Sequence, residues 1–255
     1  MSLLPSFTSL FVIWVFLNPV IAFAQKLICP VGETQIEEHP KRAYAEKDGT
    51  FVRKSQVAEH CREIFPGSKV WVSYFKNGVS ENWPQKNETH KNWLASEKKI
   101  ILTTVKELPD QLKLISLIRI SRASVSKHKE NPASSVVPLG ELTLYDLFFK
   151  ADNSTRFEIL AHEMTHFLIK DFKNKELYDF SKIAGWGHVK KKGPGGEKVV
   201  IIAPRKLLLS DSNIDVEEDF ANHMQIYLAK PEILKKFNIS TYEWFFKKFP
   251  MGQRK

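Results

Sequence analysis

The chain has 255 residues, of which 43% are hydrophobic and 26% are charged. This balance is typical of a folded globular protein and excludes a chain that is disordered or of low complexity throughout. The length allows one large domain, or a larger domain with a small N-terminal companion, and it suffices to bury a core without many crosslinks.

The formal net charge is +9, from 38 basic and 29 acidic residues. The basic residues are dispersed, with small clusters at residues 190–192 and 245–249. This excess predicts electrostatic contact with acidic surfaces, such as membranes or polyanionic wall polymers, although surface charge also serves solubility. No motif has the spacing of a nucleic-acid-binding module, so we expect no specific nucleic-acid partner. The oligomeric state is left open.

The first segment differs from the rest of the chain. Residues 6–24 carry no charge and end in Ala22-Phe23-Ala24, the small-x-small pattern of a signal-peptidase site. We therefore expect residues 1–24 to be a secretory signal peptide, cleaved near Ala24, and the protein to be secreted or periplasmic. Because no Lys or Arg precedes the apolar run, an uncleaved membrane anchor is the alternative.

Residues 25–90 form the predicted N-terminal region. It holds both cysteines of the chain, Cys29 and Cys61. In an exported protein an even pair of cysteines predicts one disulfide, and two free buried thiols are the alternative. Residues 69–75, KVWVSYF, alternate apolar and polar side chains and predict a strand.

Helices and strands are mixed over residues 91–255, which indicates an α+β fold. Apolar spacing predicts a helix from Trp93 to Leu108, ended by Pro109. Strands are expected around residues 117–123, and at 141–149 and 198–204, with a loop or hairpin before the last of these. A further helix is expected to stop before Pro231, and an aromatic helix at residues 240–249 is expected to pack on the domain.

The helix with the clearest start follows residue 152. Thr155 is expected to be its N-cap, with Glu158 three residues later completing a capping box. This helix carries His162, Glu163 and His166, an HExxH motif. Histidines four residues apart share one helix face, so both can donate a nitrogen to one Zn²⁺ ion. Glu163 can then act as general base toward a water that the metal activates.

A hydrolytic zinc site needs three protein ligands and one open position. A compact three-histidine site would need His at position 172, where this chain has Phe172. The third ligand must therefore come from elsewhere, and the acidic residues at 215–219 on a downstream helix are the best candidates.

Glu218-Asp219-Phe220-Ala221 resembles the E-x-F-A stretch that carries the third ligand in gluzincins, the HExxH enzymes with a glutamate ligand. Together with HExxH, the arrangement looks most like the lethal-factor-type secreted metalloproteases, over roughly residues 93–230. The resemblance implies a zincin-like catalytic domain over residues 91–255, with a small mixed sheet over the HExxH helix and a following helical part. It also implies Zn²⁺ bound by His162, His166 and Glu218, with Glu217 as the alternative ligand.

Two positions depart from the pattern of these families. Asn222 stands where many gluzincins have an Asp that orients a ligand histidine, and Asp211 stands where lethal-factor-type enzymes have an oxyanion-stabilising tyrosine. The tyrosine's role has four candidate replacements in this chain: His188, His223, Tyr227 and Tyr178.

The sequence therefore predicts a zinc metalloendopeptidase that acts on a protein or peptide substrate, with residues 141–149 as the edge strand that pairs with it. Two alternatives stay open. One is a basic exported binding protein without catalysis, and the other is a zinc amidase acting on a non-protein amide.

Overall fold

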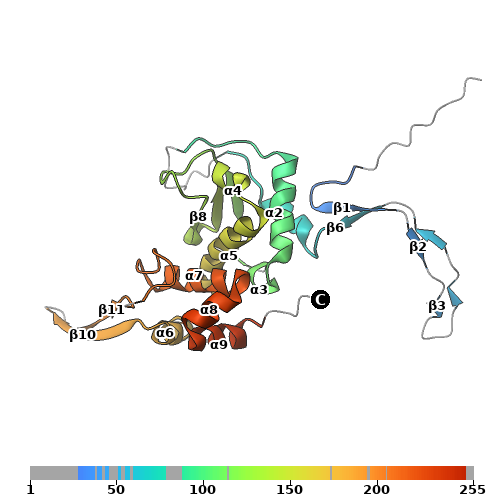
Figure 1. Ribbon diagram of the computed structural model, residues 1–255. Coiled ribbons are helices and arrows are strands. Elements are labelled where there is room, and N and C mark those ends of the chain that lie inside the picture. Colours follow the sequence, from blue (N-terminus) through green and yellow to red (C-terminus); the bar gives the residue numbers. More distant parts are fainter. Residues whose placement is uncertain are drawn as a thin grey trace, which may run out of the picture.

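The structure is a computed structural model of the chain (Figure 1). It describes residues 28–37, 39–41, 44–45, 51–52, 55–57, 60–78, 88–113, 115–172, 174–193, 196–204 and 206–250. The predicted signal peptide lies outside these residues. Within them, no helix combines the length and the apolar character needed to cross a bilayer.

The N-terminal region forms an antiparallel arm that extends away from the helices (Figure 1). Its pairs are β1 (Glu33–Ile36) with β6 (His60–Glu63), β2 (His39–Lys41) with β5 (Ser55–Val57), and β3 (Tyr44–Ala45) with β4 (Phe51–Val52). Cys29 and Cys61 form the predicted disulfide, which ties the segment before β1 to β6. The predicted boundary near residue 90 stays a prediction.

The strand predicted at residues 69–75 is wrong, because this segment is the helix α1 (Ser68–Tyr74). Ser68, Trp71 and Phe75 are buried, and they recur at the spacing of one helix face. The Ser68 hydroxyl also donates to the carbonyl of Gly32, 2.7 Å away. Tertiary burial of these three side chains outweighs the alternating pattern that suggested a strand.

The central sheet has three strands in the order β7 (Arg119–Arg122), β9 (Glu141–Leu144), β8 (Ala133–Val136). β7 runs parallel to β9 and confirms the strand predicted around 117–123, whereas β8 is antiparallel to β9. A one-turn 3-10 helix, η1 (Val137–Leu139), joins β8 to β9. All four residues of β9 are buried, as expected of a central strand.

The prediction for residues 141–149 is therefore wrong in two respects. The strand ends at Leu144, and helix α4 (Asp146–Lys150) follows. The segment is also the middle strand, so β7 and β8 form the edges. Aromatic residues favour strands in general, but the backbone carbonyls of Phe148 and Phe149 accept hydrogen bonds from the Arg156 guanidinium, which fixes this short helix.

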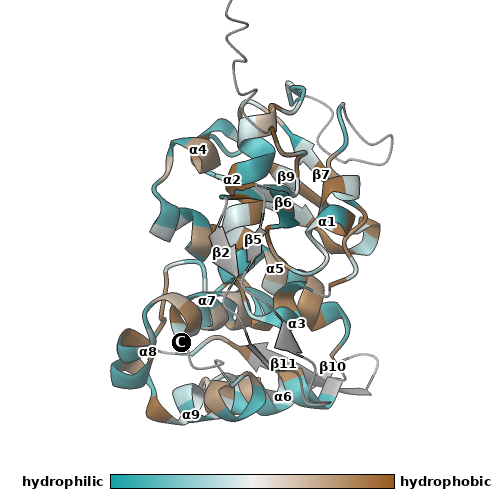
Figure 2. Ribbon diagram, turned by 90° about the vertical axis from the view of Figure 1, so that its right-hand side faces the viewer, coloured by the Kyte–Doolittle hydropathy of each residue, from teal (hydrophilic) through white to brown (hydrophobic). Residues whose placement is uncertain are grey.

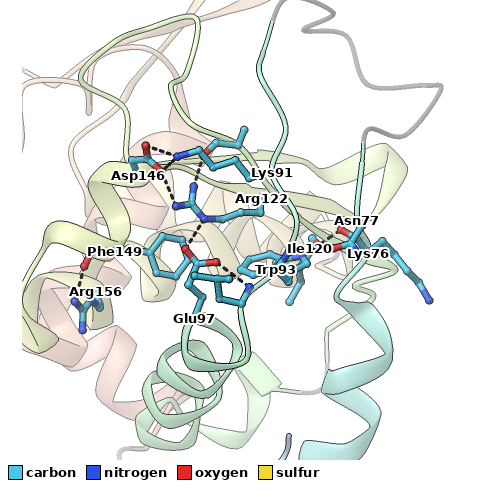
Figure 3. Close-up of polar contacts among 12 residues, drawn as sticks. Lys76, Asn77, Lys91, Trp93, Glu97, Ile120, Arg122, Asp146, Phe149 and Arg156 are labelled. Carbon is cyan, nitrogen blue, oxygen red and sulfur yellow. Dashed lines mark hydrogen bonds and ion pairs between the residues drawn. The ribbon is translucent and has the colours of Figure 1, made fainter.

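A buried arginine joins the sheet to the helices around it (Figure 3). Arg122, at the end of β7, is 4% exposed and pairs with Glu97 of α2 (Ala95–Glu107) at 3.0 Å. Its guanidinium also pairs with Asp146 of α4 and lies 4.4 Å from the ring centroid of Phe149. Lys91 is the second cation on Asp146, at 2.8 Å. The two carboxylates thus offset the charge of the buried guanidinium.

Helix α2 confirms the helix predicted from Trp93 to Leu108, and the short α3 (Asp110–Lys113) follows Pro109. The longest helix, α5 (Asn153–Lys170), begins differently from the prediction. Asp152 is its N-cap, because the Asp152 carboxylate accepts from the backbone N–H of Thr155 at 2.7 Å. Glu158 instead pairs with Lys230 at 2.7 Å. Asp152 and Thr155 both suit a helix start, and the chain uses the earlier residue.

The remaining elements lie around α7 (Val216–Ala229), which packs along α5. They are α6 (Asn174–Ile183), the hairpin of β10 (Gly187–Gly193) and β11 (Gly196–Ile202), α8 (Pro231–Phe237) and α9 (Ile239–Lys248). Phe220 of α7 contacts Phe180, Trp244 and Phe245, so α6, α7 and α9 share one aromatic core. The aromatic C-terminal helix therefore packs on the domain as predicted, and the α+β class is confirmed.

Candidate metal centre

Helix α5 brings the two histidines of the HExxH motif together. The buried apolar face of this helix consists of Leu160, Ala161, Met164 and Phe167. Burial of this face fixes the rotation of the helix about its axis. His162 and His166 lie one turn apart with side chains 17% and 12% exposed, and their Nε2 atoms are 3.1 Å from each other. Both nitrogens thus point to the same place, partly shielded from solvent.

Helix α7 supplies the third group. Asp215 caps this helix by accepting from the backbone N–H of Glu218 at 2.8 Å, which places Glu218 in the first turn. The Glu218 carboxylate lies with Oε2 3.3 Å from Nε2 of His162 and with Oε1 3.6 Å from Nε2 of His166. One ligand atom from each of the three residues lies within 4.8 Å of the others, so the three could hold one metal ion.

The choice between the adjacent glutamates follows from the helix geometry. Successive residues on a helix point about 100° apart, so only one of two neighbours can face α5. Glu218 faces the histidines, whereas Glu217 is exposed and belongs to no such group among the described residues. The structure therefore groups Glu218, the residue that the resemblance favoured, with the two histidines.

The three side chains also influence one another electrostatically. Burial would lower the pKa of His162, but its hydrogen bond with Glu218 and the nearby negative charges raise that pKa above its ordinary value. The same hydrogen bond, aided by the charges of the two histidines, holds the pKa of Glu218 below its ordinary value although the carboxyl is half-buried. The negative charges around His162 thus favour a positive charge at this site.

Glu163, the predicted general base, lies next to this group. Its side chain is largely buried, at 9% exposure, and its charge is one of those that raise the pKa of His162. An acidic side chain of low exposure near the two histidines is the arrangement that the motif requires.

The two positions that depart from the family pattern contact each other. The side-chain amide of Asn222, one turn after Glu218, donates to Asp211 at 2.7 Å and to the hydroxyl of Ser212 at 3.1 Å. The charge of Asp211 also contributes to the raised pKa of His162. One carboxylate that influences His162 in this chain is therefore Asp211, which lies in the loop before α7.

Two of the candidates for the oxyanion role contact residues of the core instead. His223 lies within 3.1 Å of Asp219 and among the rings of Phe180 and Phe245. The Tyr227 hydroxyl donates to the backbone carbonyl of Phe249 at 2.8 Å, inside the core. Tyr178 is exposed on α6. The side chain of His188 lies outside the described residues.

Sequence reasoning missed the residues that hold α7 in place. Asp219, the neighbour of Glu218, is 1% exposed and accepts from the indole N–H of Trp186 at 2.8 Å. His223 is its second partner. These contacts join α7 to the start of the β10–β11 hairpin. The only signal in the sequence was an acid followed four residues later by a histidine, which is too common to predict a buried pair.

The chain was compared with models of protein families, with curated proteins and with solved structures, and no match was found. What can be inferred about its function therefore comes from the geometry of the site and from the residues around it.

Proposed function

We propose that the protein is a zinc-dependent metallopeptidase in which His162, His166 and Glu218 bind Zn²⁺ and Glu163 is the general base. One observation carries this proposal: two histidines of an HExxH helix and a glutamate of a second helix converge within 4.8 Å. The expected secretion, with one disulfide formed, agrees with an exported enzyme.

The donor set fits zinc better than it fits the other common cations. Two imidazole nitrogens and one carboxylate are a frequent ligand set of catalytic zinc, whereas Mg²⁺ and Ca²⁺ prefer oxygen alone. Zinc holds such atoms at about 2.0–2.1 Å, so ligand atoms at two corners of a tetrahedron lie roughly 3.3 Å apart. The separations of 3.1, 3.3 and 3.6 Å are close to that value. Three protein ligands also leave a fourth position for water or substrate.

The proposed chemistry assigns a proton transfer to Glu163. When bound, Zn²⁺ lowers the pKa of a water molecule and polarises the carbonyl of a substrate amide. The Glu163 carboxylate would accept the proton of the attacking water and deliver it to the nitrogen that leaves. The low exposure of Glu163 limits competing hydrogen bonds from bulk water to this carboxylate.

The surroundings support a zincin-like arrangement. The HExxH helix α5 contacts β8, an edge strand that runs antiparallel to its neighbour β9. An edge strand carries unpaired backbone N–H and C=O groups, so an extended peptide could add to the sheet beside the metal. In this proposal β8 takes the role that the sequence had suggested for residues 141–149.

The test combines metal analysis with a digest of a proteome-derived peptide library. We expect roughly one zinc per chain in the wild type and in Glu163→Gln, and loss of zinc in His162→Ala. Hydrolysis should fall at least about 100-fold in Glu163→Gln and stop when a chelator removes the metal. Glu107→Gln, an exposed acid at the end of α2, is the matched control.

Three outcomes would count against the proposal. A wild-type rate in Glu163→Gln refutes the role of the base. A zinc-free wild type favours a binding protein. Zinc-dependent cleavage of non-protein amides alone would instead indicate an amidase with the same centre.

A further inference from the structure

Helices α8 and α9 each expose apolar side chains outside the face that packs on the domain. Helix α9 buries Thr241 and Phe245 against the aromatic core. Ile239 and Phe246 lie seven residues apart, hence on one face of the helix, and they are 47% and 56% exposed. Ile233 of α8 is 51% exposed. Hydrophobic and hydrophilic residues lie side by side along these two helices (Figure 2).

Ile239 and Phe246 form the apolar strip of α9, and Tyr242 connects this strip to α8. Its ring stacks on Phe246 with centroids 6.2 Å apart and an angle of 22° between the planes. The ammonium group of Lys235, from α8, lies 5.7 Å from the centroid of the Tyr242 ring. The apolar strip and the basic residues therefore belong to one continuous surface.

Lysines frame the strip at the C-terminal end of each helix. Lys235 and Lys236 end α8, and Lys247 and Lys248 end α9. All four are exposed, against two exposed glutamates in the same two helices. Lys248 pairs with Glu176 at 3.0 Å. The face as a whole is basic, as the excess of lysine over glutamate requires.

We propose that this surface, the α8–α9 face formed by Ile233, Lys235, Lys236, Ile239, Tyr242, Phe246 and Lys247, binds the surface of membranes that contain anionic phospholipids. The lysines would contact the headgroups, and Ile239 and Phe246 would enter the boundary between headgroups and acyl chains. Apolar insertion and electrostatic attraction together give stable binding where either one alone is marginal.

Two other kinds of partner fit the face less well. Interfaces between proteins are depleted in lysine, whereas lysine is the most frequent residue of this face. Single-stranded nucleic acid binds by stacking its bases on open aromatic rings. The Tyr242 ring is stacked on Phe246 and has Lys235 beside it, so it offers little open surface to a base.

The experiment measures co-sedimentation of the protein with vesicles of phosphatidylcholine, with or without roughly one-fifth phosphatidylserine. We expect binding to the anionic vesicles alone, weakened by added salt. Each interfacial lysine contributes about fivefold, so Lys236→Ala with Lys247→Ala should lower the partition coefficient about 30-fold. Phe246→Ser should lower it about tenfold through lost apolar contact.

Matched controls separate this face from the general charge of the chain. Lys106→Ala removes an exposed lysine from α2, and Ile118→Ser removes an apolar side chain that is 67% exposed. Both should bind like the wild type. The proposal is overturned by equal losses in the controls, by absent or charge-independent vesicle binding, or by a single-stranded DNA that binds the same face more tightly. None of these outcomes depends on the metal centre.

Discussion

Exchange of one carboxylate for an amide at two adjacent positions tests the assignment of the third ligand. Glu218→Gln removes the group that lies 3.3 Å from His162 and 3.6 Å from His166. Glu217→Gln makes the same chemical change on an exposed side chain one residue earlier. Both variants keep a side chain of nearly equal size, so packing changes little. Both also remove one negative charge from the first turn of α7.

The expected magnitude follows from the number of ligands. Structural zinc sites with four ligands bind Zn²⁺ with a free energy of about 10–16 kcal/mol, hence roughly 2.5–4 kcal/mol for each ligand. Glu218→Gln should therefore weaken zinc binding on the order of 100- to 1000-fold, since about 1.4 kcal/mol corresponds to a factor of ten. Glu217→Gln changes a screened surface charge, so its effect should stay within about threefold.

The assay is competition for zinc against a chromophoric chelator near neutral pH, with circular dichroism to verify the fold of each variant. Zinc at about 100 times its dissociation constant should add roughly 2.7 kcal/mol of stability to the wild type. For a chain of this size, that raises the melting temperature by about 5–10 °C. Glu218→Gln should show no such rise at the same zinc concentration. Equal loss in both variants, or a larger loss in Glu217→Gln, would refute the assignment.

Two further predictions concern carboxylates outside the centre, Asp146 and Asp219. Burial would raise the pKa of Asp146, but its bonds and charges with Lys91 and Arg122 lower it. A lowered pKa stabilises the fold above the ordinary value near 4 and loses that effect as pH falls through the folded value. In urea denaturation, Asp146→Asn should therefore cost a constant amount above about pH 5 and progressively less below pH 4; a cost that grows in acid would contradict this. Trp186→Phe removes the donor to Asp219 and should cost about 1–3 kcal/mol while zinc content stays near one per chain; loss of zinc with unchanged stability would refute a structural role.

The local part of the site could be predicted from the sequence, because it depends on helix geometry alone. His162 and His166 must share a face wherever their segment is helical, and turn residues before it together with regular apolar spacing made that helix evident. The helix of Glu218 was predicted on the same grounds. The disulfide was predictable too, since two cysteines have one possible pairing within the chain.

Other parts of the fold depend on contacts between distant segments and could not be predicted. The residues of α1 alternate like a strand, and only the buried positions of Trp71 and Phe75 against the core make them helical. Likewise, the strand at Glu141 ends at Leu144, and the α4 carbonyls of Phe148 and Phe149 accept hydrogen bonds from Arg156 of the next helix. Neither partner is visible from the local pattern, so propensity alone gave the wrong element.

The acidic residues at 215–219 show how packing separates roles that composition cannot. Asp215 accepts from the backbone N–H of Glu218 and caps α7. Glu217 faces solvent, Glu218 faces the two histidines, and Asp219 is buried against Trp186. These three successive carboxylates thus face solvent, the two histidines and the protein core, because each residue points about 100° away from the one before it. A shift of this helix by one residue would turn Glu217 toward the histidines and Glu218 toward the core. The cap at Asp215 fixes the start of this helix, and the bond from Trp186 to Asp219 adds to the stability of its packing.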